Sequence, residues 1–249
     1  MLNILVTGSR GFIGKNLVKK LAVNNFNILE FNRDDSLDAL EKQIIESDFV
    51  VHLAGEVRPN SSSEDFKQSN MMLTQNIVNI LEEQNRHIPI LMASTIHAKL
   101  LKNDYGKTKR DAEILIEDYS KNNNINCSIV RLPHVFGEGC KPNYNSVIST
   151  WIYNSINDLE INCFDKNIEM HYVYVQDIVD EFVSIINNKT SQNIYIEPNK
   201  VYKITLGEVV DLIEEFKQNI KNKKYDVNSE FKQKLFNTYL NYLENKDVQ

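Results

Sequence analysis

Glycine and proline are scarce in this chain of 249 residues, which contains eight glycines and five prolines. That scarcity excludes collagen-like, linker-rich and low-complexity sequences. Cysteine is rarer still: Cys127, Cys140 and Cys163 are widely spaced and include no C-x-x-C pair. We therefore expect neither a disulfide framework nor a zinc or other metal site, and we predict a cytoplasmic location, where thiols stay reduced.

Long apolar runs and an excess of positive charge are also missing. No apolar run approaches the ~20 residues of a membrane helix, and the N-terminus lacks the layout of a signal peptide. The 28 basic and 34 acidic residues give a net charge of −6. Such a chain has no general attraction for polyanions, so we expect a soluble, untargeted protein without a membrane or nucleic-acid partner.

Short apolar runs instead alternate with segments of helical period. The predicted strands span residues 3–7, 27–31, 49–53, 90–94, 127–132 and 194–197. The predicted helices between them span residues 12–24, 36–46, 70–86, 105–122 and 176–187. This alternation predicts an α/β fold with a Rossmann-type, doubly wound parallel sheet.

The pattern loosens after Pro133 into a long loop, a helix over 146–156, a weakly strand-like stretch to 175 and two terminal helices. The first terminal helix begins with a capping box, Thr205-Leu206-Gly207-Glu208. We expect residues 1–132 to form a dinucleotide-binding domain and residues 133–249 a smaller C-terminal substrate lobe. The two are interleaved, because the strand near 194–197 returns to the first sheet.

A glycine-rich turn follows the first predicted strand, with the sequence Gly8-Ser9-Arg10-Gly11-Phe12-Ile13-Gly14. The spacing G-x-x-G-x-x-G suits a tight turn, a close approach of backbone to a pyrophosphate, and close packing of helix on sheet. The following helix would direct its N-terminus at the phosphates. The turn therefore predicts dinucleotide binding, although a turn without a ligand is the alternative.

The residues at the end of the second predicted strand indicate whether the cofactor is NADH or NADPH. We assign Phe31 to the position where an acid would hold the ribose of NAD, with Glu30 on the opposite face. Beyond Asn32, Arg33 and the turn residue Arg10 then suit the 2′-phosphate of NADP. The sequence thus favours NADPH over NADH, unless a shift of one residue restores Glu30 as the acid or both arginines are solvated surface charges.

A hydroxyl, a tyrosine and a lysine follow the fourth strand. Ser94 and Thr95 end that strand, and Tyr105 and Lys109 share one face at the start of the next helix. A nearby ammonium favours phenolate, so we expect Lys109 to lower the pKa of Tyr105 and to make it an acid–base catalyst. Thr95 would hydrogen-bond the same substrate oxygen. The order of these features argues against an exposed helix start that matches by chance.

Together these segments resemble the extended short-chain dehydrogenase/reductase family of nucleotide-sugar enzymes. The resemblance includes Val50-Val51-His52-Leu53-Ala54-Gly55 at the third strand and Asn70 at the start of the next helix. It implies that Leu53, Ala54, Gly55 and Asn70 lie beside the cofactor. It also implies that Thr95, Tyr105 and Lys109 form the catalytic set, with Ser94 as the runner-up for the hydroxyl and as a substrate contact.

A narrower resemblance covers nearly the whole chain. The segments at 140–148, 203–212 and 238–243 are similar to the reductase domain of the CapF-type capsular polysaccharide enzymes. This resemblance implies NADPH-dependent reduction, at carbon four, of a UDP-linked 2-acetamido-2,6-dideoxy-4-hexulose. The product would lead to UDP-N-acetyl-L-fucosamine for capsule or O-antigen. That family also carries Arg or Lys near Arg10 and Arg33.

Two departures accompany this resemblance. Enzymes of this type usually continue into a C-terminal cupin that epimerises the sugar before reduction, and this chain stops at Gln249. We expect either a reductase that acts alone or a fragment, with the cupin separate or missing, and a homodimer. In addition, His134 occupies the position where the wider family usually has an Asn on the substrate side.

Further substrate contacts are predicted in two loops. Lys141, Asn143 and Asn145 supply ammonium and amide donors for a UDP diphosphate, unless their loop is simply solvated. Arg58, just after the third strand, would face the phosphates or the sugar.

Three other functions fit parts of this pattern. A nucleotide-sugar dehydratase is disfavoured because Ile96 and His97 stand where such enzymes need an Asp-Glu pair. An epimerase that retains NAD and a regulatory subunit that binds a dinucleotide remain alternatives. The intact set of Thr95, Tyr105 and Lys109 argues against the regulatory subunit.

Overall fold

The computed structural model describes residues 1–58, 60–188, 193–222 and 228–245. The chain divides into two compact units. The first unit comprises Met1–Leu132 and Ile178–Asn199, and the second comprises Pro133–Asp177 and Lys200–Gln249. No helix among the described residues is long and apolar enough to span a membrane.

Six parallel strands form the sheet of the first unit, in the order β2-β1-β3-β4-β5-β8. They are β1 (Asn3–Thr7), β2 (Asn27–Phe31), β3 (Phe49–His52), β4 (Ile90–Thr95), β5 (Ser128–Leu132) and β8 (Tyr195–Ile196). Their apolar runs are largely buried, as expected of a parallel sheet with both faces covered. The predicted Rossmann-type sheet is confirmed.

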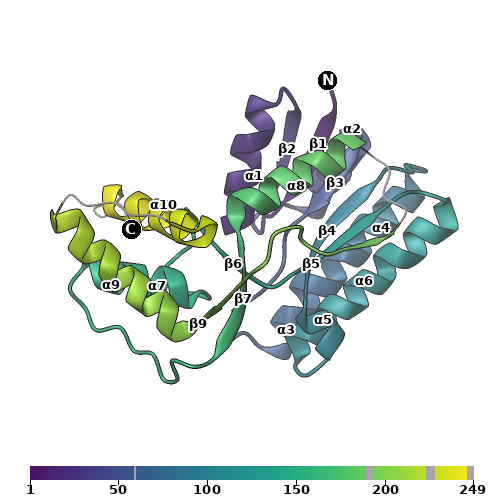
Figure 1. The fold of residues 1–249 in the computed structure, drawn as a ribbon. Helices are drawn as coiled ribbons and strands as arrows, with labels where there is room; N and C mark the ends of the chain where they lie inside the picture. Colours follow the sequence, from purple (N-terminus) through teal and green to yellow (C-terminus); the bar gives the residue numbers. More distant parts are fainter. Residues whose placement is uncertain (59, 189–192, 223–227, 246–249) are drawn as a thin grey trace. The chain divides into compact units, whose positions relative to one another are not determined.

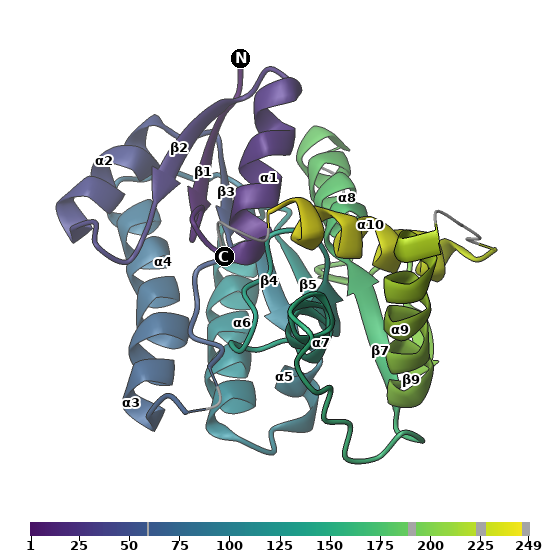
Figure 2. The ribbon, with the colours of Figure 1, turned by 90° about the vertical axis from the view of Figure 1, so that its left-hand side faces the viewer.

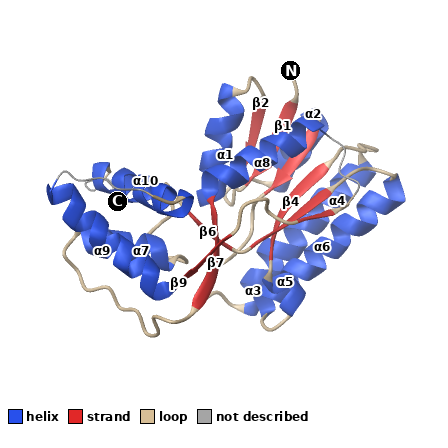
Figure 3. Ribbon diagram, in the orientation of Figure 1, coloured by secondary structure: helices blue, strands red, loops and turns tan. Residues whose placement is uncertain are grey.

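Helices cover both faces of this sheet (Figures 1 and 2). They are α1 (Phe12–Val23), α2 (Leu37–Glu46), α4 (Leu73–Glu83), α6 (Asp104–Asn123) and α8 (Val175–Asn188). Helices α1 and α8 lie on one face, where Lys20 and Asp180 form an ion pair of 2.5 Å. Helices α2, α4 and α6 bury Leu40, Ile77 and Ile116 against the other face. Figure 3 shows the same strands enclosed by helices.

The strand order creates a switch point between β1 and β3. The chain leaves β1 for β2 on one side of it and then returns to β3 on the other side. In such sheets, ligands bind at the carboxyl ends of the strands that flank the switch point. The glycine-rich turn follows β1 and the segment 53–55 follows β3, so both predicted cofactor segments lie at this place.

Within its described residues, the second unit has a small sheet and three helices of its own. Its strands are β6 (His134–Phe136), β7 (Glu169–Tyr174) and β9 (Tyr202–Thr205), with β6 parallel and β9 antiparallel to β7. Its helices are α7 (Val147–Ile156), α9 (Leu206–Asn222) and α10 (Glu230–Glu244). Phe136, Trp151 and Tyr239 belong to its core. The capping box is present, because Thr205 N donates to Glu208 and Glu208 N donates to the Thr205 hydroxyl.

Several short elements were not predicted. They are β6 and β9 in the second unit, and α3 (Ser63–Phe66), the π-helical stretch η1 (Lys67–Met72) and α5 (His97–Leu100) in the first. Asn70 therefore lies within η1 and does not open the helix, contrary to the prediction. Residues in π-helical turns are frequent at functional sites, because the wider turn changes the direction of a side chain.

Candidate active site

The glycine-rich turn has the geometry that a pyrophosphate requires. Gly8 has a φ of +72°, and a Cβ on it would lie 2.8 Å from the backbone nitrogen of Ala54. A Cβ on Gly14 would lie 2.8 Å from the Cα of Ser9. Gly11 is the N-cap of α1 and has no side chain to bond the first amides of the helix. Those amides are therefore suited to an anion.

Asn32 closes the turn from the end of β2. Its side-chain oxygen accepts hydrogen bonds from the Ser9 hydroxyl and from Arg10 N, at 3.1 and 3.0 Å. Phe31, to which the sequence assigned the ribose-facing position, is instead 5% exposed in the apolar core. That assignment was wrong by one residue, because the strand ends at Phe31 and the next residue turns toward the glycines.

A buried histidine links this turn to η1 and α4. His52 Nδ1 lies 2.7 Å from the Thr7 hydroxyl, and Nε2 lies 2.9 Å from the Thr74 hydroxyl. The Thr74 hydroxyl donates to Asn70 O, so it must accept from His52 Nε2. Burial, together with the charge of Lys109, lowers the pKa of His52 to about 3, so the ring is neutral. His52 therefore has a structural role beneath the cofactor segments.

The segment after β3 passes directly beside Lys109. A Cβ on Gly55 would lie 2.7 Å from the Asn70 side-chain oxygen and 3.9 Å from Lys109 Nζ. Asn70 accepts a hydrogen bond from Glu56 N and donates to the Thr108 hydroxyl on α6. Asn70 thus ties the predicted cofactor segment to the helix that carries the predicted catalytic residues.

Thr95, Tyr105 and Lys109 come together in the first unit. Thr95 is the last residue of β4, and its hydroxyl accepts from His97 N and makes a hydrogen bond with Tyr105. The ring centroid of Tyr105 lies 6.1 Å from that of His97. Lys109 is 5% exposed, and its ammonium donates to Ala93 O at 2.7 Å. A hydroxyl, a phenol and an ammonium therefore surround the carboxyl end of β4.

The charges at this site differ from the expectation. Burial raises the pKa of Tyr105, and the hydrogen bond with Thr95 offsets part of this effect. Burial lowers the pKa of Lys109 to about 8, while the negative charge of Glu113 works to raise it. The expected lowering of the Tyr105 pKa by Lys109 is wrong for this geometry, because desolvation dominates and the ammonium donates to a carbonyl. Tyr105 is therefore a neutral phenol at pH 7.

Ser94 is held by a buried carboxylate. Its hydroxyl donates to Glu113 at 2.5 Å, and the fully buried Glu113 also accepts from Arg131 on β5 and Arg110 on α6. Burial works to raise the pKa of Glu113, but these hydrogen bonds hold it below its usual value. The Ser94 hydroxyl thus has a partner within the protein, and its contact with a substrate stays a prediction. Glu113 was not predicted from the sequence, although it lies one helical turn after Lys109.

Two of the predicted arginines share one acid. Arg33 and Arg58 both donate to Glu56, which directly follows Gly55 and which was also not predicted. Arg58 was predicted as a substrate contact, but here it is bound to the same carboxylate as Arg33. Arg10 lies 3.9 Å from Asp34, with both side chains exposed. These charges gather at the ends of β2 and β3.

The remaining predicted substrate residues belong to the second unit. Lys141, Asn143 and Asn145 lie in the loop that precedes α7, and Asn143 N donates to the Thr150 hydroxyl. His134 is exposed on β6, with its ring centroid 5.9 Å from that of Tyr172. These four residues remain predicted substrate contacts.

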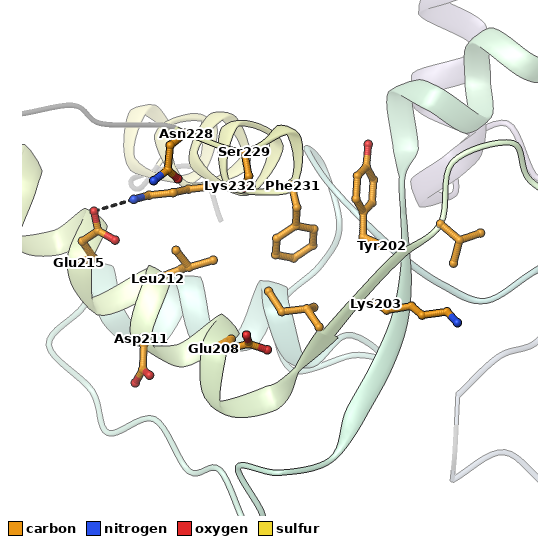
Figure 4. Close-up of a pocket in the computed structure, with 12 residues that line it drawn as sticks. Tyr202, Lys203, Glu208, Asp211, Leu212, Glu215, Asn228, Ser229, Phe231 and Lys232 are labelled. Atoms are coloured by element: carbon orange, nitrogen blue, oxygen red, sulfur yellow. Dashed lines mark hydrogen bonds and ion pairs between the residues drawn. The ribbon is translucent and has the colours of Figure 1, made fainter.

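The second unit also contains an open cavity of about 610 Å³, between β9, α9 and the start of α10 (Figure 4). Lys232 and Glu215 form an ion pair of 2.8 Å on its wall, beside Leu212. None of the predicted catalytic or cofactor residues lines it. Across the described ranges, no cluster of three or more His, Cys, Asp or Glu side chains is arranged to hold a metal ion.

Comparison with known proteins identifies relatives of this chain. Residues 4–204 match the sequence profile of the NAD dependent epimerase/dehydratase family. The chain is 34% identical over 244 residues to a UDP-2-acetamido-2,6-beta-L-arabino-hexul-4-ose reductase from Pseudomonas aeruginosa. The match covers 97% of this chain and 65% of that relative.

The chain is also similar to solved structures. The capsular polysaccharide assembling protein CapF from Staphylococcus aureus superimposes with a TM-score of 0.88 and 37% identity. The match covers the whole of this chain and 68% of that one. A UDP-glucuronic acid 4-epimerase from Bacillus cereus, in complex with NAD, has a TM-score of 0.83 at 18% identity over all of this chain and 99% of its own, and so shares the fold.

Proposed function

The chain belongs to the NAD dependent epimerase/dehydratase family, and from this premise we propose that it is an NADPH-dependent reductase of a UDP-linked keto sugar. The observation that carries the proposal is the arrangement of Thr95, Tyr105 and Lys109. A neutral phenol that is hydrogen-bonded to a hydroxyl and lies one helical turn from a buried ammonium is what the reduction of a ketone needs from a protein.

The first unit fits a nicotinamide dinucleotide. The glycines at 8 and 14 leave room for close approach, and the start of α1 offers amides for the pyrophosphate. Asn32, Leu53, Ala54 and Asn70 surround the switch point at which such a cofactor binds. When bound, a reduced nicotinamide supplies the hydride that a keto carbon accepts.

The protein itself supplies the proton and the groups that orient the carbonyl and stabilise the phenolate. Thr95 orients the carbonyl oxygen of the substrate, and Tyr105 donates its phenolic proton to that oxygen as negative charge develops. The ammonium of Lys109 stabilises the phenolate that remains and holds the nicotinamide ribose. Donors placed in advance around a developing alkoxide are usually the largest electrostatic contribution to such a reaction.

For the substrate we propose a UDP-linked 2-acetamido-2,6-dideoxy-hexulose, reduced at carbon four. This choice is supported by the names of the Pseudomonas aeruginosa reductase and of the Staphylococcus aureus protein, which assembles capsular polysaccharide. Lys141, Asn143, Asn145 and His134 would hold the UDP and the sugar. The product belongs to a route toward UDP-N-acetyl-L-fucosamine for capsule or O-antigen.

We further propose that the protein acts in the cytoplasm as a homodimer. A cupin-type epimerase, on a separate chain or on a longer form of this one, would supply the 4-keto sugar.

A spectrophotometric assay tests the proposal. NADPH or NADH is mixed with the protein and an enzymatically generated UDP-4-keto-6-deoxy-HexNAc, and the loss of absorbance at 340 nm is followed. We expect stoichiometric oxidation of NADPH. Tyr105→Phe should reduce the rate by about 10²- to 10⁴-fold, because it removes the proton donor and leaves the fold intact.

Two results would count against the reductase. If the sugar is converted while the nicotinamide is neither consumed nor released, the protein is an epimerase that retains its NAD. If the nucleotide binds but the sugar does not react with either NADPH or NADH, a regulatory subunit becomes the better explanation.

A further inference from the structure

Glu56 is a buried carboxylate at the edge of the predicted cofactor site. Its side chain is 1% exposed, and it follows directly after the segment 53–55 that ends β3. Its backbone is also fixed, because Glu56 N donates to the side chain of Asn70 at 2.8 Å. A carboxylate this deeply buried needs hydrogen-bond or ion-pair partners, because burial of an unpaired charge is costly.

The oxygens of Glu56 are fully used by the protein. Oε1 accepts from Val57 N, Arg58 N and Arg58 Nε, all within 2.8 to 2.9 Å. Oε2 accepts from Arg58 Nη2 at 2.6 Å and from Arg33 Nη2 at 3.0 Å. A carboxylate offers about four lone-pair sites, so these five donors leave none for a ribose hydroxyl. Glu56 is therefore not the acid that would hold the ribose of NAD.

The two arginines are held differently. The hydrogen bonds from Arg58, opposed in part by burial, keep the pKa of Glu56 well below its usual range, so the acid is ionised. Arg58 lies flat against it with two parallel N–H bonds, as a fork does on a carboxylate. Arg33 contributes one hydrogen bond and is 67% exposed. Among the described residues this is the one hydrogen bond of its guanidinium, so its other donors remain available to a ligand.

The position of Arg33 indicates which group of a ligand those donors would bind. It follows Asn32, which closes the glycine-rich turn through Ser9 and Arg10. The end of β2 is where a dinucleotide fold distinguishes a ribose 2′-hydroxyl from a 2′-phosphate. Taken by themselves, the side chains of Arg33, Arg58 and Glu56 carry a net charge of one positive unit.

Building on the proposed function, we propose that Glu56 is a positioning residue for cofactor selection: it holds the guanidinium of Arg33 at the end of β2, where the remaining donors take the 2′-phosphate of NADPH. A fixed guanidinium fork loses less entropy when it binds phosphate than a free one does. The selectivity for NADPH thus depends on an acid that never touches the cofactor.

The test compares ligands that differ only in the 2′-phosphate. Dissociation constants for NADPH and NADH, and for 2′-phospho-AMP and AMP, are measured by titration calorimetry without any sugar. We expect Glu56→Gln to weaken the two phosphate-bearing ligands by about fivefold to tenfold and to leave the other two within about twofold. Glu30→Gln, at an exposed carboxylate of β2, is the matched control and should change none of them.

A double-variant comparison excludes a merely structural effect. In an Arg33→Met background, Glu56→Gln should have no further effect on the phosphate-bearing ligands, because its influence passes through Arg33. Unchanged selectivity in the single variant, tighter NADPH binding, or an equal loss in both backgrounds would overturn the inference. If Glu56→Gln does not fold, the variant Arg33→Lys provides the test. A lysine places a point charge without the guanidinium fork, so this variant should lose most of the selectivity for NADPH. If Arg33→Lys retained that selectivity, the inference would be refuted.

These outcomes are separate from those of the proposed function. A protein that binds neither nicotinamide nucleotide contradicts the dinucleotide-dependent reductase itself. A protein that prefers NADPH but keeps that preference in Glu56→Gln contradicts only the role of Glu56.

Discussion

Lys109 is a residue of the candidate site whose charge changes close to neutral pH. Burial lowers its pKa to about 8, so its ammonium is mostly charged at pH 7 and mostly neutral at pH 9. Tyr105 keeps its proton over this range, because burial raises its pKa above the ordinary value. As the pH rises, the site therefore loses the positive charge of Lys109 but keeps the phenolic proton of Tyr105.

We predict that kcat/KM for the keto sugar falls above pH 8, as Lys109 loses the proton that stabilises the Tyr105 phenolate. The quantity to measure is the initial rate of NADPH oxidation between pH 6 and pH 10. Lys109→Arg is the control, since a guanidinium stays charged throughout and should give a lower but flatter profile. A decline above pH 8 that is equally steep in this variant would contradict the assignment.

Residues with a fixed local spacing were the easiest to predict. Tyr105 and Lys109 lie one helical turn apart, so the helix period alone brings them together. Glu56 was missed because its partners depend on contacts between β2 and the segment after β3. Phe31 was misassigned although the end of its strand was predicted correctly, because only the contacts of Asn32 with Ser9 and Arg10 show which residue turns toward the glycines.

The elements around the predicted catalytic residues depend on one buried acid. Glu113 on α6 binds Ser94 of β4 and Arg131 of β5, so it fastens the helix of Tyr105 and Lys109 to two strands. The side chain of Arg131 also lies 4.0 Å above the ring of Tyr195 in β8. This one carboxylate thereby fixes the geometry of the site without touching a substrate.

Glu113→Gln should lower the free energy of unfolding by about 3 kcal/mol, because it leaves the guanidinium of Arg131 without its buried counter-charge. Glu117→Gln is the matched control: this side chain is 30% exposed, and its loss should cost about 1 kcal/mol or less. Both values come from urea unfolding followed by circular dichroism. Equal losses in the two variants would show that Glu113 is not the anchor of α6.

Long periodic elements were predictable and short ones were not. The six strands of the first sheet lie within one residue of their predicted bounds, because buried parallel strands are nearly continuous apolar runs. Strands β6 and β9 have three and four residues and pair with β7 across long stretches of chain. Such short strands form through tertiary pairing, which leaves little signal in the sequence.

Each of the two units that make up the molecule has a core of its own. The first unit holds the candidate cofactor and catalytic residues, and the second holds the loop with Lys141, Asn143 and Asn145. The sheet of the first unit and the return of the strand near 194–197 to it were predictable from the sequence.

The proposed reaction delivers a hydride to carbon four of a UDP-linked sugar while Tyr105 supplies the proton. Its most direct test uses NADPH that carries deuterium at the reactive position of the nicotinamide, followed by NMR of the sugar product. We predict one deuterium on carbon four for each NADPH oxidised, and none in product formed with unlabelled NADPH in deuterium oxide. Product without deuterium at carbon four, or with deuterium drawn there from the solvent, would contradict this mechanism.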